Sequence, residues 1–425
     1  MATNTYQPII TGEADIKTAQ KRRKIYIRPF LLFWLSSVFA EVIFLAVGVF
    51  IMTGTRDLFF KVMWTLVFCP LGMGGAMGGL INVFIVDHYY GKKAAQFTGI
   101  LSLLILRADT YHHHLIQATV KAITRRFSPL QLQYLFKSYN QLYLEHCKKT
   151  GSMPIFVLNE RGLRGFWMGD PAAGYVVINF HGGGFAMDAT EAYLDLWSSV
   201  AETLSQHGTS TAWLNVTYTL APHAAYPTQF CEAVEALRHV IEDIGRSPKD
   251  IILLGDSAGA NLCLAILSHL SHPSPDAPKL QISGRLKALV CLSPWVSFRH
   301  DWPSMVYNAH KDIDARKVTE RWSLDYLNGK STSFHIEAVN APDSWWEDAQ
   351  VEQTLVLAGG DEVLLDPIKA WVTAFSESNP DTTFVAGQEE CHVAPLIWPL
   401  FGDKHETQQG AALKHWLCNR LSREA

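Results

Sequence analysis

The sequence lacks the features that point to nucleic acid, to a disulfide scaffold or to a repeat architecture. Its net charge is −4, and no basic stretch interleaved with aromatic residues occurs in the body of the chain, so nucleic acid is not an expected partner. The 7 cysteines are odd in number and scattered without C-x-x-C spacing, which argues against a disulfide framework and a zinc site. Internal repeats and low-complexity segments are also absent. We therefore expect reduced, mostly buried thiols in a globular chain.

The sequence also offers no metal centre. His112, His113 and His114 are consecutive, and consecutive positions on a helix point in different directions. Three such side chains cannot converge on one ion. We accordingly predict no metal and no cofactor.

Two long apolar runs dominate the first ninety residues of this 425-residue chain. Residues 30–53 contain Glu41 as their only charge and are about as long as a helix that spans a bilayer. Residues 62–86 carry no charge and include GMGGAMGG, a small-residue stretch that suits close helix packing in lipid. We predict a membrane anchor over residues 30–90 with two transmembrane helices. For the second run, a re-entrant or interfacial segment is the alternative.

Basic residues near the apolar runs predict the orientation of the chain in a membrane. Six lysines and arginines precede the first run, whereas two lie between the runs, so residues 1–29 are expected to be a cytosolic tail. Two spans would return the rest of the chain to the cytosol, and one span would place it in a lumen. The side on which residues 151–425 lie therefore stays open.

Residues 91–150 are predicted to form a helical linker. Apolar positions repeat at helical spacing up to Phe127, and Ser128 followed by Pro129 is typical of the first turn of a new helix. The apolar stripe then continues in that new helix as far as Leu142.

From Gly151 onward, short apolar runs alternate with helical patterns such as residues 232–244 and 260–270. The runs are continuously apolar, as expected for strands that are covered on both faces. The alternation predicts an α/β fold with a mainly parallel sheet and helices on both faces. The predicted strands are YVVINF (175–180), TAWLNVTY (211–218), IILLG (251–255), LKALVCLS (286–293) and TLVLAG (354–359).

The third of these strands leads into the turn Gly255-Asp256-Ser257-Ala258-Gly259 and then into a helix. A strand-to-helix turn of the G-x-S-x-G type needs small flanking residues, and it lifts the serine hydroxyl clear of the sheet at a helix N-terminus. A plain structural turn is the alternative. Ser257 is therefore the predicted nucleophile.

Three successive glycines, Gly182, Gly183 and Gly184, follow His181 directly after the first predicted strand. A serine nucleophile needs donors that stabilise the oxyanion formed during its attack. Without side chains, the backbone N–H groups of this loop can turn toward a substrate oxygen, joined by the N–H of Ala258. A tight turn alone would explain one or two of the glycines.

A base and an acid are expected later in the chain, because folds with such an elbow order these residues as serine, acid and histidine. His392 follows the strand-like run TTFVAG and lies on the loop after it, whereas two later histidines lie in a polar stretch and in a helical pattern. The acid should lie in the loop after residues 354–359, which offers Asp361, Glu362 and Asp366.

Together these residues resemble the hormone-sensitive-lipase-like branch of the α/β-hydrolases, which carries an HGGG motif and a GDSAG elbow. Both motifs occur here in order and at about the family's spacing, within residues 150–420. The segment YTLAPHAAYP is similar to the family's Y-R-L-A-P, with Thr219 in place of arginine. The apolar N-terminal runs and the segment ECHVAPL make the chain most similar to fungal membrane hydrolases such as steryl acetyl hydrolase, and to arylacetamide deacetylase.

The resemblance implies an oxyanion hole formed by Gly183 and Gly184 with Ala258. It also implies a helical cap over the site, built from residues of about 97–150 and from an insertion after LSPW, at about 296–345 of the catalytic domain 151–425.

The resemblance also ranks the candidate acids. The family's D-x-L-x-D motif fits residues 362–366, which favours Glu362 as the acid that orients His392 and gives Asp366 a supporting role. Asp361 has the family's residue type but misses the spacing by one, and it stays the alternative.

The resulting hypothesis is a serine esterase or deacetylase, a carboxylic ester hydrolase that cleaves short-chain acyl esters of lipophilic alcohols through an acyl-enzyme. The expected partners are a lipophilic ester and membrane lipid, the expected location is the endoplasmic reticulum membrane, and the oligomeric state is open. An acyltransferase or a cyclising or eliminating enzyme, and a non-catalytic binding protein on the same fold, are the alternatives. Five tryptophans of the insertion region would suit either an apolar pocket or ordinary core packing: Trp295, Trp302, Trp322, Trp345 and Trp346.

Overall fold

The computed structural model describes residues 111–421 of the chain. The predicted membrane spans at 30–53 and 62–86 and the basic tail lie outside the described residues, and so does Cys69. Within residues 111–421, no helix combines the length and the apolar character needed to cross a membrane.

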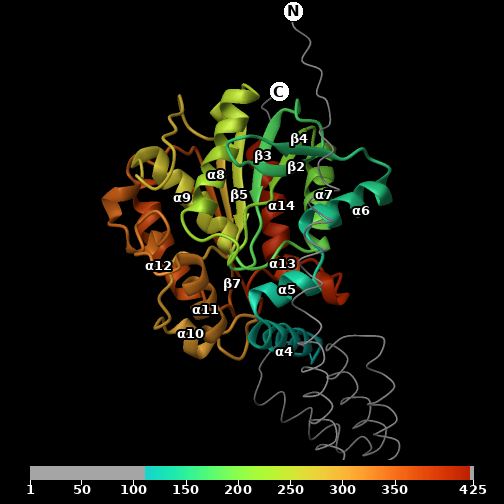
Figure 1. Cartoon of the computed structure of the whole chain (residues 1–425), viewed down its shortest axis with the longest axis vertical. Coiled ribbons are helices and arrows are strands. Elements are labelled where there is room, and N and C mark those ends of the chain that lie inside the picture. Colours follow the sequence, from blue (N-terminus) through green and yellow to red (C-terminus); the bar gives the residue numbers. More distant parts are fainter. Residues whose placement is uncertain (1–110, 422–425) are drawn as a thin grey trace, which may run out of the picture. The chain divides into compact units, whose positions relative to one another are not determined.

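One eight-stranded sheet lies at the centre of the described domain (Figure 1). Its strand order is β1-β2-β4-β3-β5-β6-β7-β8, in which β2 pairs antiparallel with β1 and β4 and all other neighbours are parallel. The prediction of a mainly parallel sheet is confirmed, and the five predicted strands correspond to β3 through β7. The strands are β1 (Ile155–Leu158), β2 (Arg164–Met168), β3 (Tyr175–Phe180), β4 (Thr211–Val216), β5 (Ile251–Asp256), β6 (Ala288–Leu292), β7 (Thr354–Gly359) and β8 (Thr382–Gly387).

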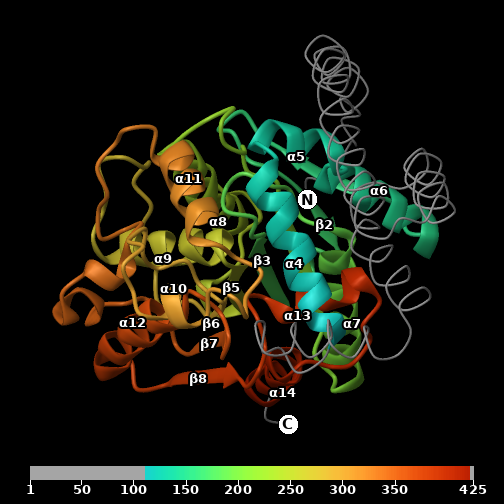
Figure 2. The ribbon, with the colours of Figure 1, turned by 90° about the horizontal axis from the view of Figure 1, so that it is seen from below.

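Helices cover both faces of this sheet (Figure 2). Side chains of α8, α9 and α12 join one apolar cluster, whereas side chains of α7 and α14 join the other. The helices are α4 (Tyr111–Arg126), α5 (Pro129–Leu135), α6 (Tyr139–Thr150), α7 (Glu191–Gln206), α8 (Thr228–Arg238), α9 (Ala258–Ser271), α10 (Ser304–Tyr307), α11 (Arg316–Leu327), α12 (Leu365–Ser378), α13 (Ala394–Ile397) and α14 (Gln408–Leu421).

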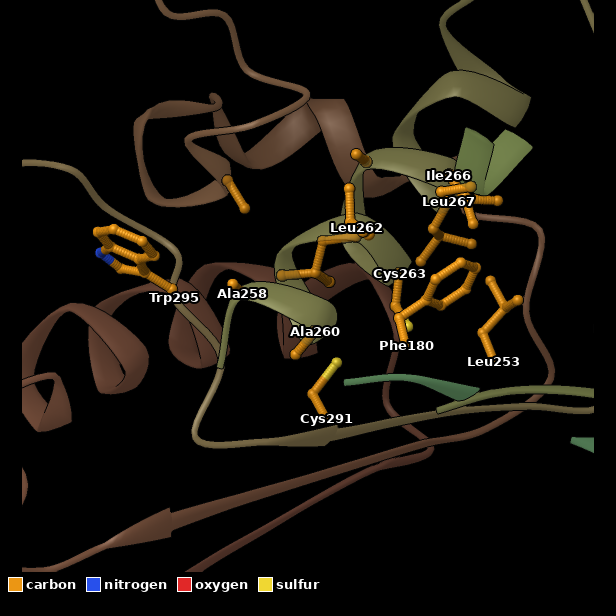
Figure 3. Close-up of a cluster of buried hydrophobic side chains, with 14 of the residues drawn as sticks. Phe180, Leu253, Ala258, Ala260, Leu262, Cys263, Ile266, Leu267, Cys291 and Trp295 are labelled. Carbon is orange, nitrogen blue, oxygen red and sulfur yellow. The ribbon is translucent and has the colours of Figure 1, made fainter. Parts of the chain in front are cut away.

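The two-sided cover explains why the central strands are apolar throughout. In β3, Val176 and Ile178 belong to one cluster, and Val177 belongs to the other, because successive side chains of a strand point to opposite faces. Figure 3 shows side chains of α9, among them Cys263, packed against Phe180 of the sheet.

The thiols take part in this packing. Of the described cysteines, Cys147, Cys263, Cys291 and Cys391 are buried, Cys231 and Cys418 are half-buried, and none forms a disulfide. The expectation of mostly buried thiols is therefore confirmed for the described part of the chain.

The helical linker contains one more break than the sequence pattern predicted. Ser128 caps α5 through a capping box with Gln131, as the Ser-Pro signal indicated. The continuous helix predicted up to Leu142 is wrong, because Phe136 is extended and Ser138 starts α6 with a second capping box. The helical spacing of apolar residues continues across the break between α5 and α6, so this spacing alone could not reveal the break.

The segment between β6 and β7 forms the insertion that carries α10 and α11. It contacts α4, since the Lys121 Nζ donates to the Ala309 carbonyl at 2.7 Å and the Arg321 guanidinium donates to the Thr124 carbonyl at 2.7 Å. Figure 1 shows α4, α10 and α11 together at the lower end of the described domain. The two segments that the family resemblance assigns to a cap therefore meet each other.

Candidate active site

Ser257 lies in the turn between β5 and α9. Its φ of 50° and ψ of −117° are a strained conformation for a residue with a side chain. The N–H of Ser257 donates to the Leu292 carbonyl at 2.8 Å, and the Ser257 carbonyl accepts from the N–H of Trp295 at 3.1 Å. The end of β6 and the segment after it therefore hold the turn in this conformation.

Close backbone contact requires glycine beside this turn. A Cβ atom at position 259 would overlap the carbonyl oxygen of Phe180, the last residue of β3. The missing side chain lets α9 start directly against the end of β3. The elbow and the glycine loop, which begins at Gly182, two residues after Phe180, consequently lie side by side.

The glycine loop presents open backbone donors. Gly183 and Gly184 have φ values of 95° and 60°, which glycine adopts without strain. The N–H of Gly182 donates to Asp256 Oδ1 at 2.8 Å and is therefore engaged. Within residues 111–421, the N–H groups of Gly183, Gly184 and Ala258 donate to no other protein atom. These are the three donors that the resemblance assigned to the oxyanion hole.

Asp256 ties the glycine loop to α7. Besides the N–H of Gly182, its carboxylate accepts the hydroxyl of Tyr193 at 2.7 Å. Burial raises the pKa of Asp256 to about 7, against the lowering effect of the Tyr193 hydrogen bond. Sequence reasoning placed Asp256 in the elbow and missed Tyr193, because no motif connects two residues that are 63 positions apart.

His181 supports the glycine loop as a neutral ring. Its Nδ1 lies 2.8 Å from the Gly182 carbonyl, and its ring stacks on Tyr218 with centroids 4.4 Å apart. The Tyr218 hydroxyl donates to the His181 carbonyl at 2.7 Å. Burial lowers the pKa of His181 to about 4, so this ring is uncharged at neutral pH.

His392 follows β8 and lies against the acid loop after β7. Its Nδ1 is 3.3 Å from Glu362 Oε2, and both side chains are buried. Glu362 Oε2 also accepts from the N–H of Gly359 at 3.2 Å, which fixes the carboxylate on its own loop. The structure therefore brings together the histidine and the acid that the motif spacing favoured.

The other two candidate acids have different partners. Asp361 Oδ1 forms an ion pair with the Lys311 Nζ at 2.9 Å. Asp366 was expected in the loop after β7 but lies in the first turn of α12. It accepts from the N–H of Ser304 at 2.8 Å and from the Tyr307 hydroxyl at 2.7 Å, so it anchors α10 of the insertion to the start of α12. Within residues 111–421, neither Asp361 nor Asp366 forms a hydrogen bond or an ion pair with His392.

Two carboxylates of the insertion were missed by the sequence analysis. Asp312 accepts the N–H of His392 at 2.9 Å and the N–H of Val363 at 2.8 Å, and it joins the histidine loop to the acid loop. Asp314 Oδ2 lies 3.7 Å from His392 Nε2, on the opposite side of the ring from Glu362. They could not be found from a local pattern, because Asp312 and His392 are 80 residues apart.

The electrostatic surroundings favour the charged form of His392. Burial opposes a charge on the ring, but the carboxylates of Asp314 and Glu362 outweigh burial and raise the pKa of His392 to about 10. Burial also raises the pKa of Asp312 to about 7, with a further contribution from Asp314.

In this structure the candidate active site is largely closed to solvent. Ser257 is 7% exposed and His392 is 3% exposed. The Ser257 hydroxyl has no hydrogen-bond partner within residues 111–421, and His392 Nε2 faces Asp314. The nucleophile and the base candidate thus lie at the same edge of the sheet without a hydrogen bond between them.

The tryptophans of the insertion region divide into two groups. The ring of Trp322 on α11 lies against Gly184, and Trp295 lies beside Phe185 with ring centroids 6.0 Å apart. Phe185 also stacks on Tyr326 with centroids 3.8 Å apart. These rings form an apolar wall next to the glycine loop.

The remaining tryptophans pack elsewhere. Trp345 stacks on His272, and Trp346 packs against Trp371 and Phe375. Trp302 is half-buried, donates to the Ser297 hydroxyl at 3.2 Å and lies under Arg299. Core and surface packing therefore account for these three.

Comparison with known families agrees with the fold and the motifs. The family model described as "alpha/beta hydrolase fold" matches residues 177–396, which is just over half of the chain and includes the glycine loop, the elbow and His392. The chain belongs to this α/β-hydrolase family.

Its curated relatives include several hydrolases. An acetyl-hydrolase of Streptomyces hygroscopicus is 27% identical over 234 residues, covering 53% of this chain and 70% of that protein. An esterase of Acinetobacter venetianus is 26% identical over 271 residues, covering 61% and 81%. Steryl acetyl hydrolase 1 of Saccharomyces cerevisiae is 22% identical over 209 residues, covering 46% of each chain. The predicted hormone-sensitive-lipase-like family and the predicted esterase class of enzyme are confirmed.

Solved structures support the same architecture. A crystal structure of an esterase from the bacterial hormone-sensitive lipase family covers 74% of this chain and 100% of its own, with a TM-score of 0.55 and 22% identity. At this level of identity the likeness shows the fold.

Proposed function

We propose that the chain is a serine hydrolase that cleaves short-chain acyl esters, acetyl esters above all, of lipophilic alcohols. Ser257 is the nucleophile, His392 the general base, and Glu362 the acid that orients His392 and stabilises its charged form. The observation that carries this assignment is the pairing of His392 Nδ1 with Glu362 Oε2 at 3.3 Å, at the sheet edge that also holds the strained Ser257 turn.

In the first half of the reaction, the Ser257 oxygen attacks the ester carbonyl carbon while its proton passes to His392 Nε2. The carbonyl oxygen becomes an oxyanion, and the N–H groups of Gly183, Gly184 and Ala258 donate to it. The bond to the alcohol oxygen then breaks as His392 returns the proton to that oxygen. An acyl-Ser257 and a free alcohol result.

In the second half, water replaces the alcohol. His392 takes a proton from water, the hydroxide oxygen bonds to the acyl carbon, and the bond from that carbon to the Ser257 oxygen breaks. The proton passes from His392 to the Ser257 oxygen, which restores the serine. The carboxylic acid leaves, and no metal or cofactor takes part in a step.

The closed arrangement must change before proton transfer. Although burial opposes a charge, the carboxylates of Asp314 and Glu362 raise the pKa of His392 and favour the charged ring, which cannot accept the serine proton. His392 Nε2 therefore has to exchange Asp314 for Ser257, with loss of a proton, as substrate enters. Asp314 lies on the insertion, so movement of the insertion can perform this exchange.

The substrate class rests on the surroundings of the glycine loop and on the relatives. Trp322, Phe185 and Tyr326 offer an apolar wall for a lipophilic group. Relatives named acetyl-hydrolase and steryl acetyl hydrolase suggest a small acyl group on a bulky alcohol. The apolar runs before residue 90 suggest that the enzyme meets such an alcohol at a membrane.

Covalent labelling tests the nucleophile. An alkyl fluorophosphonate probe should label the full chain, and Ser257→Ala should abolish both labelling and hydrolysis of a sterol acetate. Ser205→Ala, an exposed serine on α7, is the matched control and should behave as wild type. Undiminished labelling of Ser257→Ala would show that the nucleophile is another residue.

The product mixture separates hydrolysis from acyl transfer. With a radiolabelled acetyl ester, free acetate should form without an added alcohol, at a rate that a second alcohol changes little. If label passes mainly to the added alcohol, the enzyme is an acyltransferase.

We also propose an integral protein of the endoplasmic reticulum membrane with a cytosolic N-terminus. The supporting features are the two apolar runs and the excess of basic residues before the first one. Carbonate washing should leave the protein in the membrane pellet. Digestion of a C-terminal tag in intact microsomes would favour two spans, and protection would favour one.

A further inference from the structure

A cavity of about 340 Å³ lies at α4, and none of the proposed catalytic residues lines it. Its lining residues include the basic residues Lys121, Arg125 and Arg126, together with His310 and Gln117. The cavity belongs to the face of α4 that meets the insertion at Ala309.

The composition of α4 creates this hollow. Gln117, Lys121 and Arg125 follow one another at intervals of four residues, so they share one helix face. The neighbouring row contains the small residues Ala118 and Ala122, which leave space between the long side chains. The result is a recess with three cationic side chains around it.

Positive charge is concentrated here without matching carboxylates. Lys121 donates to the Ala309 carbonyl at 2.7 Å, and no Asp or Glu of residues 111–421 forms an ion pair with Lys121, Arg125 or Arg126. Asp312 and Asp314 act on Lys121 only through their more distant charge. A bound anion would provide the missing counter-charge.

Gln117 adds a second, independent indication of a ligand. Its side chain is 3% exposed, yet its Oε1 has no hydrogen-bond partner in the described structure. A buried acceptor without a donor costs free energy, so a turn of the Gln117 amide that brings Oε1 to a ligand hydroxyl in the cavity would be stabilising. Together, the cations and this acceptor favour a ligand that carries both a phosphate and a hydroxyl.

Helix-end electrostatics alone could explain Arg125 and Arg126, since basic residues stabilise the last turn of a helix. The chain contains its own comparison in α6, which ends with Lys148 and Lys149. These two lysines have the same relation to a helix end, and neither lines this cavity. If binding of a ligand requires Arg125 and Arg126 but not Lys148 and Lys149, the ligand binds in the cavity.

We propose that this cavity binds the phosphate group of a polyol phosphate ester, with Arg125, Arg126 and Lys121 as counter-charges and Gln117 as the partner of a ligand hydroxyl. Such a group occurs both in the headgroup of an anionic glycerolipid and in a soluble sugar or glycerol phosphate. The site adjoins the segment that leads to Asp312 and hence to the His392 loop.

Binding can be measured on the full chain in a non-ionic detergent. The probes are sn-glycerol 3-phosphate, inorganic phosphate and dioctanoyl phosphatidylglycerol, each titrated by microscale thermophoresis at low and at high salt. Arg125→Gln with Arg126→Gln should weaken binding of the polyol phosphates by about tenfold or more, because charge-assisted hydrogen bonds are lost. Affinity in the wild type should fall as salt is raised.

Two further variants separate the cavity from general charge. Lys148→Gln with Lys149→Gln removes the same charge from the end of α6 and should change each affinity by less than about twofold, because exposed distant charges are screened. Gln117→Leu should weaken glycerol 3-phosphate by about fivefold, through loss of one hydrogen bond, and leave inorganic phosphate unchanged. Unliganded melting temperatures verify that all variants fold.

The probes distinguish the two sources of ligand. Arginine-dependent binding of glycerol 3-phosphate supports the proposal with a soluble ligand, and arginine-dependent binding of the lipid alone supports it with a headgroup. The proposal is overturned if no probe binds, if the arginine variant binds as wild type does, or if the α6 lysine variant loses as much affinity.

Discussion

The serine side and the histidine side of the candidate active site are built by different means. Ser257 and the glycine loop are positioned by backbone hydrogen bonds and by the close approach of Gly259 to Phe180. His392 is instead surrounded by the carboxylates of Glu362, Asp312 and Asp314. The first side therefore depends on the path of the main chain, and the second depends on charge.

This difference predicts how each side responds to a conservative substitution. Replacing a carboxylate by its amide keeps the shape of the side chain but removes charge and acceptor capacity, so it should affect the histidine side strongly. On the serine side, loss of the supporting Tyr193 hydroxyl should matter little, because the backbone contacts that hold Ser257 and the glycine loop remain.

Among the substitutions that leave Ser257 in place, the largest effect is expected from Glu362→Gln. An amide next to Nδ1 no longer stabilises the charged ring and can hold the wrong tautomer, so kcat should fall by about a thousandfold or more. Asp361→Asn is the matched control, because Asp361 pairs with Lys311 instead, and kcat should fall by less than about tenfold. Esterase kinetics on folded variants would assign the acid role to Asp361 if the ranking were reversed.

Asp312→Asn should have the next largest effect. The carboxylate accepts N–H groups from both the histidine loop and the acid loop, and an amide can accept at only one of its two ends. We expect a loss of about 1–3 kcal/mol in the free energy of unfolding, measured in urea, and a lower kcat. Wild-type stability together with wild-type kcat would mean that Asp312 does not join the loops.

Asp314→Asn should shift the pH dependence of catalysis. Asp314 helps to raise the pKa of His392 to about 10, and the reaction needs the neutral ring. Removing this carboxylate should lower the pKa of the acidic limb of kcat/KM by about one unit or more, so that activity appears at lower pH. Asp301→Asn, an exposed carboxylate of the insertion paired with Arg299, should leave that limb in place.

The same substitution should alter the pH dependence of stability. A raised pKa in the folded chain means that the charged His392 stabilises the fold fully below its unfolded pKa of about 6.5, and that this contribution is lost as pH rises toward 10. Asp314→Asn should therefore reduce the melting temperature more at pH 6 than at pH 10. An equal reduction at both values would contradict the ion pair.

The smallest effect is expected on the serine side, from Tyr193→Phe. This change removes one hydrogen bond to Asp256 but leaves the bond from the N–H of Gly182, so unfolding should cost about 1 kcal/mol less. The kcat should stay within about threefold of wild type. A larger loss of kcat than in Asp312→Asn would break the contrast between the two sides.

Sequence reasoning found the parts of the fold that leave a regular local pattern. The strands β3 through β7 were visible because burial on both faces makes them apolar throughout. The short antiparallel strands β1 and β2 were missed, since β1 is largely exposed and carries no alternating apolar pattern. The break between α5 and α6 was also missed, because the apolar stripe continues across it.

The site residues also divide into those that a local sequence pattern reveals and those that it does not. Ser257, the glycine loop and the spacing that favoured Glu362 all lie within stretches of a few residues, where the residue types restrict the backbone directly. Tyr193, Asp312 and Asp314 carry no such signature, because a lone tyrosine or aspartate fits many surroundings. Their partners became evident only where the chain brings distant loops together.

The sequence by itself thus determined a mainly parallel α/β domain, a strained serine turn, a glycine loop with open donors and a histidine on the loop after β8. The tertiary structure alone decided which charges surround that histidine. Glycine and strand patterns act over a few neighbouring residues through steric limits on φ and ψ, so they can be read in order along the chain. Electrostatic effects depend on distances in space and on burial, and here both arise from an insertion that folds back onto loops about 50 and 80 residues later.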